Sequence, residues 1–131
     1  MGNSNNGLEI PIMKVWDNII ATAIVGSLDS ERTEKLMEAL LDEVDRLGAR
    51  FTIIDISGVP SMDTQVAQHL LKLASALNMM GSQCILSGIR PDVAQTVVDF
   101  DIDFSAVRPQ PNLASALKIA LQKLGYSISS D

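Results

Sequence analysis

Apolar residues follow two different spacings along the chain, and the spacing separates expected strands from expected helices. Short apolar segments rich in β-branched residues predict strands, whereas longer segments with apolar residues every three or four positions predict amphipathic helices. The expected strands are Ile10–Trp16, Ile19–Val25, Phe51–Ile56, Gln83–Ser87 and a short one at Ser105–Arg108. The expected helices are Ser30–Leu47, one from near Asp63 that stops at Gly81, Pro91–Asp99, and one from Asn112 that stops at Gly125.

Residues that favour turns and helix ends separate these segments. Asp17 and Asn18 suit a tight hairpin turn between the first two strands. Asp29 is suited to cap the first long helix and Gly48 to end it. The order β-β-α-β-α-β-α-β-α predicts an α/β fold, with a mixed sheet of four to five strands, an N-terminal β-hairpin and about four helices.

The composition is that of one folded domain. Its 131 residues, 47% of them apolar and 20% charged, can bury a single core and are too few for a second full domain. Sixteen acidic residues against ten Lys and Arg give a net charge of −6. This charge argues against binding to nucleic acid or to an anionic membrane surface, so we expect proteins as partners.

The chain is poor in side chains that carry out catalysis. A single cysteine excludes an internal disulfide and a Cys-based zinc site, and a single histidine leaves few routes to other metals or to acid–base catalysis. We expect no metal, no cofactor and no enzymatic activity. Cys84 is expected to be a small buried hydrophobe, and His69 is expected to face the solvent.

No apolar run reaches the roughly 18 residues of a membrane-spanning helix, and the chain does not start with the basic-then-apolar order of a signal peptide. We therefore expect a cytoplasmic protein. Residues 1–9 are expected to form a disordered leader, residues 10–125 the folded domain and residues 126–131 a frayed tail.

Two expected helix starts carry an acid followed by a hydroxyl. They are Asp29-Ser30 at the first long helix and Asp63-Thr64 at the second. A hydroxyl in a first helical turn is exposed, and a phosphate added there meets free backbone N–H groups and the positive end of the helix dipole. The same pattern also serves ordinary helix capping, which needs no phosphate.

Asp55 and the segment Ser87–Pro91, with Gly88 and Arg90, each allow more than one interpretation. Asp55 ends an interior strand like the phosphoacceptor of a receiver domain, but Ala23–Ser27 offers no acidic pair to hold magnesium. We expect its carboxylate to accept backbone N–H bonds from the loop Ser57–Val59 instead. At Ser87–Pro91, Gly88 permits positive φ and Arg90 is able to meet an anion or a nucleotide, although the segment lacks the glycines and lysine of a phosphate-binding loop.

Two further residue types are assigned from their positions. Met62, at a loop tip, is expected to be exposed, whereas the other methionines, including Met79 and Met80, are expected to fill the core. Trp16 is expected to anchor the N-terminal hairpin.

Three segments together resemble the STAS domain, the sulphate transporter and anti-sigma factor antagonist domain. They are Val25–Arg32, Ile54–Thr64 and Leu86–Pro91, and the resemblance runs from about Ile10 to Leu124. The turn Gly88–Pro91 followed by Ala94-Gln95-Thr96 is similar to that of RsbR-type stressosome scaffold proteins in particular. RsbR-type proteins usually carry an N-terminal sensory domain, whereas only a few polar residues precede the STAS region here, as in an excised domain or a minimal family member.

The resemblance implies a non-enzymatic partner-switching module that regulates a stress-response sigma factor or a similar output. It implies a serine/threonine kinase of the GHKL-type ATPase superfamily as partner, with Thr64 and Ser30 as the phosphorylated hydroxyls. Paralogous RsbS-type proteins are implied as partners in a large assembly, together with a homodimer or higher oligomer. The implied partner-binding residues are Asp63, Met62, Asp29, Gln65 and Gln68.

Two alternatives stay open at this point. A stand-alone anti-sigma-factor antagonist would use the same second helix to bind an anti-sigma kinase. A nucleotide-binding or small-ligand-binding STAS domain would instead use Gly88 and Arg90 with the neighbouring helix starts.

Overall fold

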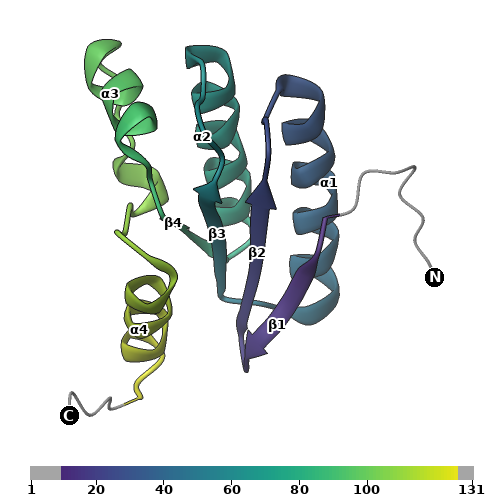
Figure 1. The fold of residues 1–131 in the computed structure, drawn as a ribbon. Helices are drawn as coiled ribbons and strands as arrows, with labels where there is room; N and C mark the ends of the chain where they lie inside the picture. Colours follow the sequence, from purple (N-terminus) through teal and green to yellow (C-terminus); the bar gives the residue numbers. More distant parts are fainter. Residues whose placement is uncertain (1–9, 127–131) are drawn as a thin grey trace.

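The structure, a computed structural model, describes residues 10–126 as one α/β unit (Figure 1). Its strands are β1 (Ile12–Trp16), β2 (Ile19–Val25), β3 (Phe51–Gly58) and β4 (Gln83–Ser87). Its helices are α1 (Ser30–Leu47), α2 (Thr64–Met79), α3 (Pro91–Asp99), the short 3-10 helix η1 (Ser105–Val107) and α4 (Leu113–Lys123). The expected leader at residues 1–9 and most of the expected tail, residues 127–131, lie outside the described residues.

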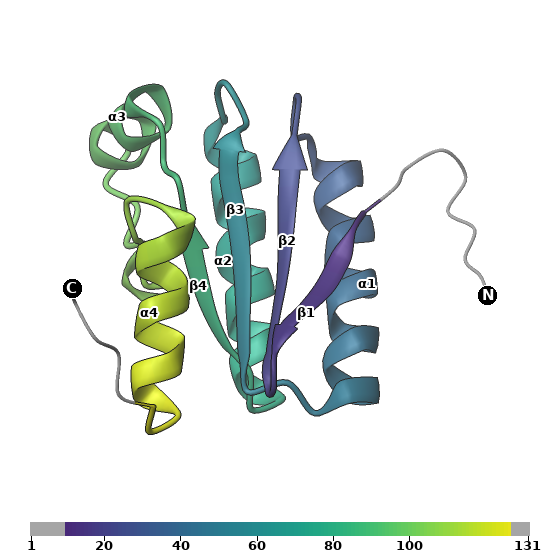
Figure 2. The same ribbon diagram turned by 60° about the horizontal axis from the view of Figure 1, so that its bottom comes forward.

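The four strands form one mixed sheet in the order β1-β2-β3-β4, which confirms the predicted fold class. β1 pairs antiparallel with β2 through a turn in which Asn18 has φ 68°, a left-handed conformation that Asn tolerates. β2, β3 and β4 are parallel. Their carboxyl ends therefore share one edge of the sheet, and α1, α2 and α3 begin there (Figures 1 and 2).

Helices cover the sheet on both faces. On one face α1 and α2 bury the larger apolar cluster, which includes Ile20, Leu40 and Leu70. On the other face α4 lies across β3 and β4 (Figure 2) and buries a smaller cluster that includes Ile53 and Ala120. Coverage on both sides explains why β3 is apolar at consecutive positions.

The predicted strand at Ser105–Arg108 is wrong, because these residues form η1 and its C-cap. Asp103 accepts a hydrogen bond from the Ser105 N–H at 3.0 Å, which favours a turn, and Arg108 has φ 44°, which ends an extended run. Pro109 follows and has no N–H for a ladder. In the described part of the chain, the expected fifth strand is reduced to one parallel bridge between Ser87 and Gln110.

The expected exposure of Met62 and the expected burial of Met79 and Met80 are also wrong. Met62 is buried, with 5% of its surface exposed, whereas Met79 is 84% exposed. Met80 follows it on the surface at the end of α2. Met79 lies two residues after the buried Leu77, and a two-residue step in a helix leads to the opposite side. The end of α2 therefore presents apolar side chains to solvent.

Trp16 is half exposed and packs edge-on against Tyr126, with ring centroids 5.8 Å apart. This contact joins the N-terminal hairpin to the residues after α4. Cys84 is buried as expected, and burial raises the pKa of its thiol to about 12. Within residues 10–126, the helices are all too short or too polar to cross a bilayer.

Candidate functional site

Ser30 and Thr64 occupy the same position in two neighbouring helices, because each is the first residue of its helix. The preceding aspartates have extended backbones and act as N-caps, as predicted. Asp29 accepts a hydrogen bond from the Arg32 N–H at 2.8 Å, and Asp63 accepts one from the Val66 N–H at 2.8 Å. Both hydroxyl-bearing residues are half-buried, and so less exposed than expected for a first helical turn, because each follows a buried residue by two positions. The structure thus places two similar hydroxyls at one edge of the sheet.

The start of α1 is held by hydrogen bonds from side chains of its own first residues. The Arg32 guanidinium folds back, and its Nη1 donates to the Ser27 carbonyl at 2.8 Å. The Thr33 hydroxyl donates to the Asp29 carbonyl at 2.7 Å. Leu28, directly before the cap, is buried. These bonds give the loop before Ser30 a defined path.

The start of α2 is held mainly from the core side. Met62, directly before the cap, packs in the main cluster with Val59 and Val66. Its side chain therefore supports the loop from within, although it was expected to be exposed and the resemblance implied that it binds a partner. Gln65 and Gln68, two other expected contact residues, are exposed on α2. The caps Asp63 of α2 and Asp29 of α1 are exposed as well. His69 is half-buried and not fully solvent-facing.

The two loops that lead to Ser30 and Thr64 touch each other. Val25 pairs with Gly58 at the ends of β2 and β3, and the Gly26 N–H donates to the Gly58 carbonyl at 2.9 Å. A Cβ at Gly58 would lie 3.1 Å from the Ile24 carbonyl oxygen and 3.2 Å from the Val25 Cα. Position 58 therefore suits glycine, because the two strand ends approach closely there.

Asp55 binds the ends of β3 and β4 together, just before the loop that leads to Thr64. Its Oδ1 accepts from the Ser57 N–H at 3.0 Å and from the Ser57 hydroxyl at 2.6 Å, and its Oδ2 accepts from the Ser87 hydroxyl at 2.7 Å. The predicted bond from the loop backbone is thus confirmed at Ser57. Burial raises the pKa of Asp55, but the hydrogen bonds from Ser57 and Ser87 outweigh it and hold the pKa below its ordinary value.

The two hydroxyl partners of Asp55 were not predicted from the sequence. The Ser57 bond carries a local signal, because an Asp two residues before a polar residue often forms an Asx turn. The Ser87 bond carries none, since it depends on the register that places Ser87 beside Asp55 on the neighbouring strand. Among residues 10–126, no three His, Cys, Asp or Glu side chains converge as a metal site.

Gly88 and Arg90, the expected anion contacts, do not form one surface. Gly88 is buried at φ 76°, and a Cβ there would lie 2.8 Å from the Ser57 Cβ. Its small size thus serves the close contact with Ser57. Arg90 is exposed and precedes Pro91 at the start of α3. The geometry gives a packing reason for Gly88 that needs no ligand.

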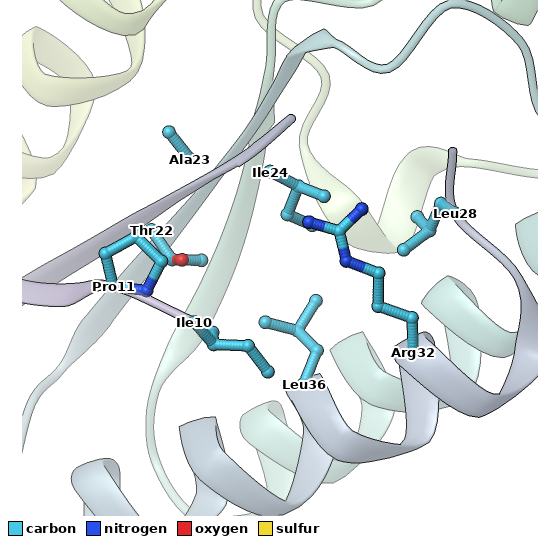
Figure 3. A pocket seen from close by; sticks show the side chains of 8 residues that line it. All are labelled: Ile10, Pro11, Thr22, Ala23, Ile24, Leu28, Arg32 and Leu36. Carbon is cyan, nitrogen blue, oxygen red and sulfur yellow. The ribbon is translucent and has the colours of Figure 1, made fainter. Parts of the chain in front are cut away.

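A small hollow lies between the hairpin and α1 (Figure 3). Arg32 is the one charged residue in its lining, and its guanidinium extends toward Ile24 and Leu28. The buried Thr22 hydroxyl, also in the lining, has no hydrogen-bond partner in the described part of the chain. The lining is mostly apolar and contains no glycine, unlike loops that cradle nucleotide phosphates.

Comparison with known proteins places this architecture in a family. A family model described as "STAS domain" matches residues 11–116. The chain is 38% identical over 123 residues to the RsbT co-antagonist protein RsbRA of Bacillus subtilis (strain 168), covering 94% of this chain and 45% of that relative. It therefore spans less than half of the relative's length.

Solved structures agree with this placement. A variant of Moorella thermoacetica RsbS superposes with a TM-score of 0.73 at 29% identity, covering 88% of this chain and 96% of that one. A chain of the structure described as "Molecular architecture of the stressosome, a signal integration and transduction hub" superposes with a TM-score of 0.70 at 26% identity, covering 89% and 100%. The chain belongs to the STAS domain family and is similar to its RsbR-type members.

Proposed function

We propose that this chain is a protein-interaction module of a stressosome-type partner-switching pathway. Its surface at the starts of α1 and α2 binds a serine/threonine kinase of the GHKL-type ATPase superfamily, which phosphorylates Thr64 and Ser30. The observation that carries the proposal is the pair of hydroxyls at the first helical position behind aspartate caps, on one sheet edge. Similarity to an RsbT co-antagonist supports the kind of pathway.

The geometry suits a phosphoacceptor. In each transfer the γ-phosphoryl group passes from ATP to the Ser or Thr oxygen, ADP leaves, and the hydroxyl proton is released. The product phosphate lies at a helix start, where unpaired backbone N–H groups and the helix dipole favour negative charge. The helix therefore tolerates the modification without unfolding.

The output is a change of charge on the docking surface. Each phosphate adds about −1.5 to −2, so two phosphates take the net charge from −6 to about −9 or −10. The exposed residues Asp63, Gln65 and Gln68 surround Thr64 and form the expected contact for the kinase, with Asp29 beside Ser30. New negative charge there weakens docking by like-charge repulsion or by the cost of removing water from the phosphate in the interface, and the kinase is released.

The direct test is to incubate the domain with its cognate kinase and Mg-ATP and to locate phosphate by mass spectrometry. We expect label on Thr64 and Ser30, and none in a protein carrying Thr64→Ala and Ser30→Ala together. Label at neither residue, under conditions in which a paralogous STAS protein is labelled, contradicts the proposal.

A binding test separates charge from folding. Thr64→Asp should weaken kinase binding, while circular dichroism and thermal melting stay close to wild type. Ser75→Asp is a matched control, because Ser75 is exposed farther along the same helix. Loss of fold in Thr64→Asp would show that Thr64 is a packed structural residue, and equal weakening by both variants would show a nonspecific effect of charge.

The partner assembly follows from the same family relationship. We expect the domain to associate with a second copy and with RsbS-type STAS proteins in a larger complex, because a chain of the stressosome structure shares its fold at 26% identity. Co-purification from the source cell, followed by identification of the bound kinase, tests this expectation. An anti-sigma kinase in place of a stressosome-type kinase would instead identify a stand-alone antagonist.

A further inference from the structure

The Asp55 carboxylate lies near the end of β3, the strand that leads into the loop that presents Thr64. Both of its oxygens are engaged, by two donors from Ser57 and one from Ser87, and only 8% of the residue is exposed. A group this buried has little surface to offer a kinase. Its bonds tie the end of β3 to the end of β4 at the place where the chain leaves the sheet.

The loop continues from this anchor without another charged group until Asp63. The Val59 N–H donates to the Ile56 carbonyl at 2.9 Å, and Val59 and Met62 are buried. Ser57 is exposed to solvent on one side, but Gly88 packs so closely against it on another that a Cβ at position 88 would lie 2.8 Å from the Ser57 Cβ. The path from Ser57 to the Asp63 cap is therefore set by the Asp55 network at one end and by the core at the other.

The Ser30 loop does not share this anchor. In the part of the chain that the structure describes, no hydrogen bond joins Asp55 to residues 26–29, and that loop is held by the Arg32 guanidinium on the Ser27 carbonyl. Its link to the Thr64 loop is the Gly26–Gly58 backbone bond. Loss of the Asp55 network should thus affect the two hydroxyls unequally.

We propose that Asp55, with Ser57 and Ser87, is a positioning residue that fixes the loop carrying Thr64 in the conformation that the kinase phosphorylates. This inference rests on the proposed function. Asp55 acts through the loop and touches neither Thr64 nor the kinase. Small misplacements of a reacting group are enough to cost one to two orders of magnitude in rate, so the carboxylate has a measurable effect at a distance.

The test uses the whole domain with Asp55→Asn, which keeps the shape and removes the charge, and with Ser87→Ala, which removes one donor. Mass spectrometry of one kinase reaction gives kcat/KM for Thr64 and Ser30 in the same molecules. We expect a loss of about tenfold or more at Thr64 and less than about twofold at Ser30. Asp42→Asn is the matched control, because Asp42 is exposed on α1.

The ratio of the two rates distinguishes positioning from general damage. Equal losses at Thr64 and Ser30 would show reduced folding, and unchanged Thr64 kinetics would show that the network is dispensable; both outcomes overturn the inference. If Asp55→Asn does not fold, Ser87→Ala decides, because it leaves both Ser57 donors in place.

A second measurement needs no kinase. Amide hydrogen exchange should accelerate at Val59 and Val66 in Asp55→Asn and stay unchanged at Arg32, whose N–H is bonded to Asp29. Faster exchange in a protein whose Thr64 is never phosphorylated would refute the proposed function and leave the loop anchor intact. Unchanged exchange in a protein that is phosphorylated would refute the anchor alone.

Discussion

The starts of α1 and α2 share one residue pattern but are stabilised by different contacts. Each has a buried apolar residue, an aspartate cap and then a hydroxyl, and each cap accepts its N–H at 2.8 Å. The α1 start adds Glu31 and Arg32 in its first turn, and Arg32 bonds to the loop. The first turn of α2 has no charged residue, and the loop before it is held by the core and by the hydrogen bonds of Asp55 at the end of β3.

Local sequence therefore determines where each hydroxyl stands in its helix, whereas tertiary contacts determine the path of the loop before it. Substitutions in the shared pattern should affect the two helix starts alike. Substitutions of Arg32 or of the Asp55 network should affect one helix start only. A phosphate on Ser30 would be added within two residues of a cation, and one on Thr64 would have no cation within the first turn. The same modification thus enters two electrostatic settings.

The largest effect is expected from the buried residues that precede the caps. Met62→Ala and Leu28→Ala should each lower the free energy of unfolding by about 2 to 5 kcal/mol, because each leaves a cavity in the main core cluster. Urea unfolding measures both. A loss near zero for Met62→Ala would show that its side chain lies on the surface, as its loop position suggested.

The burial of Met62 shows where prediction from sequence stops at the site. Asp29 and Asp63 could be assigned as caps because a cap bonds to an N–H only three residues ahead. Met62 could not be placed, since its environment depends on how the loop folds over α2 and β3. For the same reason, the Ser87 partner of Asp55 becomes visible only when the strand register is known.

The second largest effect is expected at Asp55, which makes the free energy of unfolding depend on pH. Because its folded-state pKa lies below the ordinary value of 3.8, the ionised carboxylate stabilises the fold above that pH and loses this contribution as pH falls through the folded pKa. Asp55→Asn should cost about 1 to 3 kcal/mol at neutral pH through its lost hydrogen bonds. The difference from wild type should shrink in acid.

Urea unfolding of wild type, Asp55→Asn and Asp42→Asn over a pH series checks this. The Asp42 variant should run parallel to wild type, because Asp42 is exposed. A gap between wild type and Asp55→Asn that stays constant down to the lowest pH would mean that the charge of Asp55 does not support the fold.

The fold itself was predictable wherever periodicity and local signals agreed. The boundaries of α1 are those given by Asp29 and Gly48, and Asn112 caps α4 through the Ser115 N–H. Prediction failed at Ser105–Arg108, where the composition suits a strand but the backbone turns before it can pair with β4. A strand exists through its pairing, and Pro109 and the left-handed Arg108 limit that pairing to one bridge.

Removal of either aspartate cap is expected to lower the free energy of unfolding by a smaller amount, which is the same for both caps. Asp29→Ala and Asp63→Ala should each cost about 1 kcal/mol, because each frees one N–H of the first turn. Thermal and urea unfolding measure the loss, and replacement by Asn should restore most of it. Clearly unequal losses would contradict the shared pattern and indicate that one aspartate has an additional role.

The smallest effect is expected at Arg32 and belongs to α1 alone. Arg32→Gln removes the bond from the guanidinium to the Ser27 carbonyl, an exposed contact worth about 0.5 kcal/mol. Amide exchange near Ser30 should rise while that at Val66 stays constant, and Arg46→Gln, at the far end of α1, is the control. A matching rise at Val66 would show that the Gly26–Gly58 bond transmits the loosening, so that the two helix starts respond as one unit.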